Sequence, residues 1–127
     1  MFSHIMVGSN DLDQSKKFYD ALFDAIGAKP GRVDEKGISY LHNGALFMVR
    51  PPLDGKKATH GNGSTIGFTI DSPDRVDAWH AAGVRTGGTS IEDPPGVRQG
   101  SFGALYLAYL RDPDGNKLCA LHRLPAD

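Results

Sequence analysis

The chain has 127 residues, of which 39% are hydrophobic and 23% charged, values typical of one globular domain with a single core. A net charge of −1 leaves no surplus of lysine and arginine to neutralise phosphates, so we expect no nucleic-acid binding. No apolar run is long enough to span a membrane. The first residues lack the pattern of a signal peptide, and the single cysteine excludes an internal disulfide. We therefore expect a cytoplasmic protein without membrane contact.

The first half of the chain predicts one strand, one helix and three further strands. Alternating residues over Ser3–Val7 are typical of a strand, and apolar residues at three- and four-residue spacing predict an amphipathic helix over Leu12–Ile26. The Asn43-Gly44 pair between two apolar runs is a strong hairpin signal. We therefore expect three short strands, over Gly31–Glu35, Ile38–His42 and Ala45–Arg50.

The second half begins with a polar segment, Pro51–Gly63, whose glycine, proline and lysine residues predict an exposed linker or lid. A strand over Ser64–Ile70 and a helix over Pro73–Ala82 follow, and Gly83 is a plausible stop for that helix. The remaining expected elements are a short strand near Val84–Thr86, a loop over Thr89–Gly100, and paired strands over Phe102–Arg111 and Lys117–His122.

The order of elements in the first half recurs in the second. At an offset of 61 residues (65 − 4), His4 falls on Thr65 and Phe18 falls on Trp79. We therefore predict an α+β fold made of two βαβββ modules in tandem. The chain is then a single domain, residues 1–127, with module 1 at about 1–52, a linker at about 53–62 and module 2 at about 63–127.

Five short segments carry a resemblance to known proteins. They are Asn10-Asp11-Leu12, Ser15–Tyr19, Gly87-Gly88, Pro95–Arg98 and Asp112–Lys117. Over nearly the whole chain, the sequence resembles the vicinal oxygen chelate superfamily, which includes glyoxalases, bleomycin-resistance proteins and extradiol dioxygenases. The resemblance implies that curved mixed sheets of the two modules form a cleft. It also implies a homodimer in which the partner chain completes or supports that cleft.

In metal-dependent members of this superfamily, four inward side chains from the first and last strand of each module bind one divalent ion. The matching positions here are His4, Met48, Thr65 and Cys119, and only His4 is a standard ligand. A thioether and a neutral hydroxyl are poor ligands for Mg, Mn, Fe(II) or Ni. His4 and Cys119 alone fall short of the three protein ligands that a catalytic zinc site usually has. We therefore expect no bound metal and no other cofactor.

Two further side chains complete the predicted ligand cleft, which consists of His4, Met48, Thr65, Cys119, Arg98 and Tyr106. In the loop that the resemblance places beside the cleft, Arg98 is either a clamp for a carboxylate or phosphate, or an exposed loop residue. Tyr106 and Tyr109 alternate along one strand, so only one of them faces the cleft, and the sequence does not decide which.

His4 is the best candidate for a catalytic residue, as a general base, although a lone histidine is more often a structural polar residue. Cys119 is either a nucleophile or, more simply, a small buried apolar side chain. The sequence leaves open whether the protein is an enzyme.

We expect a glyoxalase/bleomycin-resistance-like protein that binds a small organic molecule in the cleft without the usual divalent metal. One alternative is a metal-dependent lyase or isomerase of the glyoxalase I kind, in which the metal would raise the acidity of a substrate proton. Another is an accessory partner domain without any small ligand.

Overall fold

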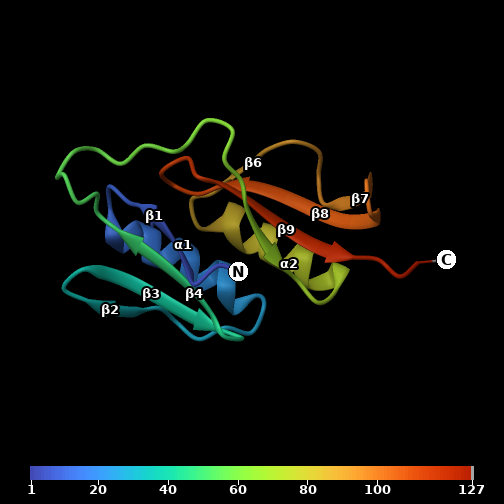
Figure 1. Cartoon of the computed structure of the whole chain (residues 1–127), viewed down its shortest axis with the longest axis horizontal. Coiled ribbons are helices and arrows are strands. Elements are labelled where there is room, and N and C mark those ends of the chain that lie inside the picture. Colours follow the sequence, from blue (N-terminus) through green and yellow to red (C-terminus); the bar gives the residue numbers. More distant parts are fainter. Residues whose placement is uncertain (127) are drawn as a thin grey trace.

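The structure, a computed structural model, describes residues 1–126 and contains two modules that lie side by side (Figure 1). Module 1 contains β1 (His4–Gly8), α1 (Leu12–Asp24), β2 (Arg32–Asp34), β3 (Gly37–His42) and β4 (Ala45–Arg50). Module 2 contains β5 (Ile66–Thr69), α2 (Pro73–Arg85), β6 (Thr89–Ser90), β7 (Gly96–Gly100), β8 (Gly103–Arg111) and β9 (Lys117–Arg123). None of the helices in this part of the chain is long and apolar enough to cross a bilayer.

Each module forms its own sheet, and the two sheets have the same strand order. The first sheet is ordered β1-β4-β3-β2, and the second is ordered β5-β9-β8-β6, with β7 also paired to β8. In both sheets the first strand of the module pairs in parallel with the last, as β1 does with β4 and β5 with β9. The predicted α+β fold of two βαβββ modules is therefore confirmed.

One helix covers one face of each sheet, and both helices begin as their sequences dictate. The side chain of Asp11 accepts a hydrogen bond from Gln14 N at the start of α1, and Ser72 accepts one from Arg75 N at the start of α2. The apolar stripes of the two helices place Phe18 and Trp79 in the core, where both are fully buried.

The two modules share one core. The principal contact between them is made by α1 and α2. Phe68 of β5 adds a second contact, because its ring centroid lies 5.3 Å from that of Phe23 and 5.6 Å from that of Phe47, both in module 1. Edge-to-face aromatic pairs of this kind stabilise a fold beyond the area they bury.

The end of α2 differs from the prediction. The helix continues to Arg85, so the expected stop at Gly83 and the expected strand near Val84–Thr86 are both wrong. Gly83 is buried, and a Cβ atom at this position would collide with Cδ1 of Leu110 on β8. The glycine therefore permits close packing of the helix on the sheet.

The loop expected over Thr89–Gly100 also differs, because it contains β6 and β7, which both pair antiparallel with β8. Between the modules, β4 ends at Arg50 and β5 begins at Ile66. The connecting segment is fixed at Ala58, which exchanges two hydrogen bonds with the side chain of Asn10. The predicted end of module 2, residue 127, lies outside the described residues.

Candidate functional site

Each sheet has a second face, away from its helix. On β4, Phe47 and Val49 are buried in the core, so Met48 between them lies on the opposite face. Met6 of β1 is the parallel partner of Met48, and it lies on that same face. The open face of module 1 is defined by His4, Met6, Leu41, Leu46, Met48 and Arg50.

The second sheet has the same arrangement. Leu118 and Ala120 of β9 are fully buried in the core, which leaves Cys119 on the other face. Its partners in neighbouring strands are Gly67 and Tyr109. The open face of module 2 is defined by Gly67, Leu107, Tyr109, Lys117, Cys119 and Leu121, and Thr65 directly precedes β5 at its edge.

Tyr106 lies on the helix-covered face and not with Cys119. It alternates with Ala108 and Leu110, which are both fully buried, and its hydroxyl donates a hydrogen bond of 2.8 Å to Asp77 of α2. The structure therefore does not bring Tyr106 together with Cys119, its expected neighbour in the ligand cleft. Tyr109, which the sequence left as the alternative, is the tyrosine on the same face as Cys119.

The four positions that match metal ligands form two separate pairs. His4 and Met48 belong to the first sheet, whereas Thr65 and Cys119 belong to the second. Within residues 1–126, no strand of one sheet pairs with a strand of the other, and no hydrogen bond joins the two pairs. Within the same residues, no cluster of three or more His, Cys, Asp or Glu side chains is placed to hold a metal.

The module 1 pair has its own interactions. His4 is exposed, and its Nδ1 lies 2.8 Å from Ser3 Oγ, so its partner is a hydroxyl and not the carboxylate that often orients a general base. Met48 is buried, and its sulfur accepts a hydrogen bond of 3.3 Å from Arg50 Nη2. A guanidinium at this sulfur opposes the binding of a divalent cation at the same place.

The module 2 pair is equally unsuited to a metal. Cys119 is only 5% exposed, and burial raises the pKa of its thiol. A metal ligand must be a thiolate, and a raised pKa disfavours that form. The hydroxyl of Thr65 is a weak ligand, and its residue is exposed. The donor set of His4, Met48, Thr65 and Cys119 therefore does not fit the divalent metal of metal-dependent relatives.

A charged group borders the open face of module 2. Lys117 Nζ lies 2.5 Å from Glu92 Oε2 and 5.0 Å from the centroid of the Tyr109 ring. Burial, followed by the neighbouring Cys119, raises the pKa of Tyr109, so this hydroxyl remains protonated. Neither Lys117 nor Glu92 was predicted from the sequence, since the strand-and-turn pattern alone does not reveal which loop faces Lys117.

Arg98 lies on β7, where its register partner is Leu105 of β8. Its Nη2 donates hydrogen bonds to the carbonyl oxygens of Asp93, at 2.9 Å, and Pro94, at 3.0 Å. The loop before β7 thus holds the guanidinium beside the second sheet, with further N–H groups that these two bonds do not use.

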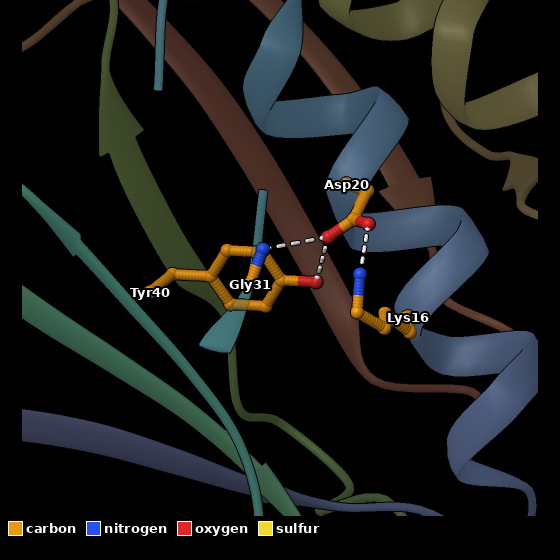
Figure 2. Close-up of polar contacts among 4 residues, drawn as sticks. All are labelled: Lys16, Asp20, Gly31 and Tyr40. Atoms are coloured by element: carbon orange, nitrogen blue, oxygen red, sulfur yellow. Dashed lines mark hydrogen bonds and ion pairs between the residues drawn. The ribbon is translucent and has the colours of Figure 1, made fainter. Parts of the chain in front are cut away.

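Tyr40 of β3 is buried and has a structural role. Its hydroxyl donates to Asp20 Oδ1 at 2.8 Å, and Asp20 also accepts from Gly31 N at 2.9 Å and from Lys16 Nζ (Figure 2). Burial by itself would raise the pKa of Asp20, but the hydrogen bonds from Lys16, Gly31 and Tyr40 together lower it. This cluster fixes the segment before β2 to α1.

Two cavities lined by the described residues have the size of small-molecule pockets, which are generally about 300–1,000 Å³. One, of about 730 Å³, lies at the end of the open face of module 1 and is lined by Met6, Val7, Gly8, Lys36, Arg50, Pro51, Pro52, Leu53, Asp54, Lys57, Ala58 and Thr59. The other, of about 510 Å³, lies between the modules beside Phe23, Tyr40, Phe47 and Phe68. None of the six predicted cleft residues lines either cavity.

The model of the Glyoxalase/Bleomycin resistance protein/Dioxygenase superfamily matches residues 1–120. The crystal structure of a glyoxalase/bleomycin resistance protein from Albidiferax ferrireducens T118 is 58% identical, with a TM-score of 0.95, and the match covers 97% of this chain and 99% of that one. A search of curated proteins found no match.

More distant structures share the fold. A glyoxalase-related enzyme from Fulvimarina pelagi is 19% identical with a TM-score of 0.73, and the match covers 97% of this chain and 88% of that one. A glyoxalase/bleomycin resistance protein/dioxygenase family enzyme from Burkholderia phytofirmans PsJN is 18% identical with a TM-score of 0.73, over 96% and 98% of the two chains.

Proposed function

Because the chain belongs to the Glyoxalase/Bleomycin resistance protein/Dioxygenase superfamily, we propose that it binds a small organic molecule without a divalent metal. The binding cleft forms between module 1 of one chain and module 2 of a second copy. The observation that supports this proposal is the hydrogen bond from Arg50 Nη2 to Met48 Sδ. Met48 is one of the four positions that match metal ligands, and the positive guanidinium beside it disfavours a divalent cation there.

The shared cleft is supported by the separation of the two open faces. Within one chain the helices, and not the strands of the two open faces, make the principal contact between modules. The open face of module 1 also exposes apolar side chains, since Met6 is 54% exposed and Leu41 is 72% exposed. In a two-fold symmetric dimer, module 2 of each chain would cover the open face of module 1 of the other chain, and this arrangement would create two equal clefts.

The residues favour binding over catalysis. The pKa values of the Cys119 thiol and the Tyr109 hydroxyl are both raised, so neither group is poised as a base near neutral pH. The side-chain partner of His4 is the hydroxyl of Ser3 and not a carboxylate that would orient it as a general base. The open faces carry mostly apolar side chains, such as Met6, Met48 and Leu107, with a few polar ones, as expected for a pocket that encloses a small organic molecule.

The proposal is tested on protein purified without a metal-affinity tag. Light scattering should give the mass of a dimer, and elemental analysis should find less than one divalent metal per ten chains. A thermal-shift screen of small metabolites should yield stabilising compounds whose effect is lost in Thr65→Trp. The size-matched control Lys17→Trp, at an exposed position of α1, should retain the effect.

Each contrary outcome has a clear meaning. One tightly held transition metal per chain, with activity that chelation removes, would establish a metal-dependent lyase or isomerase instead. A monomer, or a dimer that no compound of the panel stabilises, would point to an accessory domain without a small ligand.

A further inference from the structure

We propose that the ligand of this cleft carries an anionic group, a carboxylate or a phosphate, which Arg50, Lys36 and Lys57 bind at the end of the open face of module 1. The inference rests on the proposed function and adds the chemical class of the ligand to it. The anionic group occupies the cavity of about 730 Å³ that these three side chains line together with Met6.

The position of Arg50 connects this cavity to the cleft. Arg50 is the last residue of β4 and lies on the same face as Met48, two residues earlier. Its parallel partner is Gly8 at the end of β1, which has no side chain to cover the guanidinium. A ligand held by Arg50 therefore extends directly over Met48 and Met6.

The charge of the cavity is positive. Three basic side chains and one acidic side chain, Asp54, line it. Asp54 Oδ1 already accepts a hydrogen bond from the backbone N–H of Lys56 at 2.9 Å, as in a turn. Asp34, whose carboxylate the charge of Arg50 reaches, accepts the backbone N–H groups of Lys36 and Gly37. Both acids are thus engaged by backbone donors.

The donors of Arg50 are poorly used within the described chain. Its hydrogen bond goes to the thioether of Met48, a weak acceptor. The three ion pairs in residues 1–126 involve Lys16, Arg75 and Lys117, and none of them includes a basic residue of this cavity. A half-buried guanidinium in this state gains a strong charge-assisted interaction when a planar carboxylate or a phosphate binds.

The remaining walls define the rest of the ligand. Met6, Pro51, Pro52 and Leu53 contribute apolar surface, and the segment that carries the prolines is fixed at Ala58 by Asn10. Apolar walls with one cationic end suit a small organic acid whose body is apolar or aromatic. A cationic or neutral compound of the same shape gains nothing from the three basic residues.

The experiment uses ¹³C-methyl NMR of the three methionines. Met6 lines the cavity and Met48 contacts Arg50, so both report on the site, whereas Met1 does not line it. The probes are 2-naphthoate, its neutral analogue 2-naphthalenemethanol, its cationic analogue 2-naphthylmethylammonium, and inorganic phosphate. We expect 2-naphthoate to shift the methyl signals of Met6 and Met48 and to bind at least tenfold more tightly than the other two naphthalenes. Competition by phosphate at low millimolar concentration would identify a phosphate site, and its failure a carboxylate site.

Two variants and one control complete the test. Arg50→Gln should weaken the binding of 2-naphthoate by about tenfold or more, and the exposed linker variant Lys57→Gln by about threefold. Arg32→Gln, which removes an exposed positive charge from β2 outside the cavity, should leave binding unchanged.

Equal binding of the neutral and anionic probes, or unchanged binding to Arg50→Gln, would overturn the inference while the cleft itself remains supported. No shift of Met6 or Met48 with any naphthalene would overturn the inference, and would remove the proposed function too if the metabolite screen also found no compound.

Discussion

The hydroxyl of Tyr19 in module 1 donates a hydrogen bond of 2.5 Å to Asp112 Oδ2 in module 2, across 93 positions of the chain. Asp112 also accepts from the backbone N–H groups of Asp114 and Asn116 in the turn between β8 and β9. The turn therefore has a second role beside joining two strands, because it fixes module 2 to the helix of module 1.

Replacing Tyr19 with phenylalanine should destabilise the protein by about 1.5–3 kcal/mol, because it removes a buried hydrogen bond to a charged acceptor without changing the volume of the ring. The free energy of unfolding in urea measures this loss. Tyr106→Phe, which removes the hydrogen bond to Asp77 near the surface, is the matched control and should cost less than about 1 kcal/mol. Equal losses in the two variants would contradict a special role of Tyr19.

The Asp20 cluster predicts a stability change at acid pH. The pKa of Asp20 is lowered in the folded protein, so the carboxylate stabilises the fold above its unfolded pKa of about 3.9, and this contribution is lost as the pH falls through the lower folded value. Unfolding of the wild type and of Asp20→Asn should therefore differ most above pH 4 and converge below it. The measurement needs one fixed protein concentration, because a dimer unfolds in a concentration-dependent way. A difference that stays constant down to the lowest pH would refute the prediction.

The periodic parts of the fold could be predicted from the sequence, and the exceptions have physical reasons. Alternation and helical spacing locate β1, α1, β3, β4 and β9 to within two residues at each end. The sequence favours a helix stop at Gly83, but the helix continues past this residue. The glycine is needed because the side chain of Leu110, which is distant in the sequence, leaves no room for a Cβ atom. The short strand β7, GVRQG, lacks alternation and exists because it pairs with β8.

The same limit applies to the site. The sequence alone predicts a poor metal site, because three of the four matching side chains, those of Met48, Thr65 and Cys119, are not the usual ligands of a divalent metal in this superfamily. The face of Tyr106 could not be predicted, because a strand with apolar residues on both sides has no sequence signal for the side that a helix covers. Arg50 and Lys57 line the same cavity because of the path that the linker takes between the modules, and the sequence does not reveal this path.

The state of Cys119 can be measured by alkylation, since it is the single cysteine of the chain. Burial raises the pKa of its thiol, so iodoacetamide at pH 8 should modify the folded protein at least about tenfold more slowly than the protein in urea. The double variant Thr65→Cys/Cys119→Ser places a thiol at an exposed position and should react at nearly the rate of the unfolded chain. Rapid alkylation of folded wild-type protein would reveal a reactive thiolate and restore a catalytic role for Cys119.

A mixture of two disabled variants distinguishes a cleft between chains from a cleft within one chain. His4→Trp fills the module 1 half of the site and Thr65→Trp fills the module 2 half, and both residues are exposed in the chain, so both variants should fold. Neither homodimer should bind 2-naphthoate. In a heterodimer, one cleft receives both tryptophans and the other receives none, because each cleft takes one module from each chain.

Heterodimers isolated with two different affinity tags should therefore bind one molecule of 2-naphthoate per dimer, half the stoichiometry of the wild type, as measured by isothermal titration calorimetry. A cleft built within one chain gives a different result, since every chain then carries one tryptophan in its own site and no binding returns. Failure of the heterodimer to bind, with intact binding by wild-type dimers carrying the same tags, would place the site within a single chain.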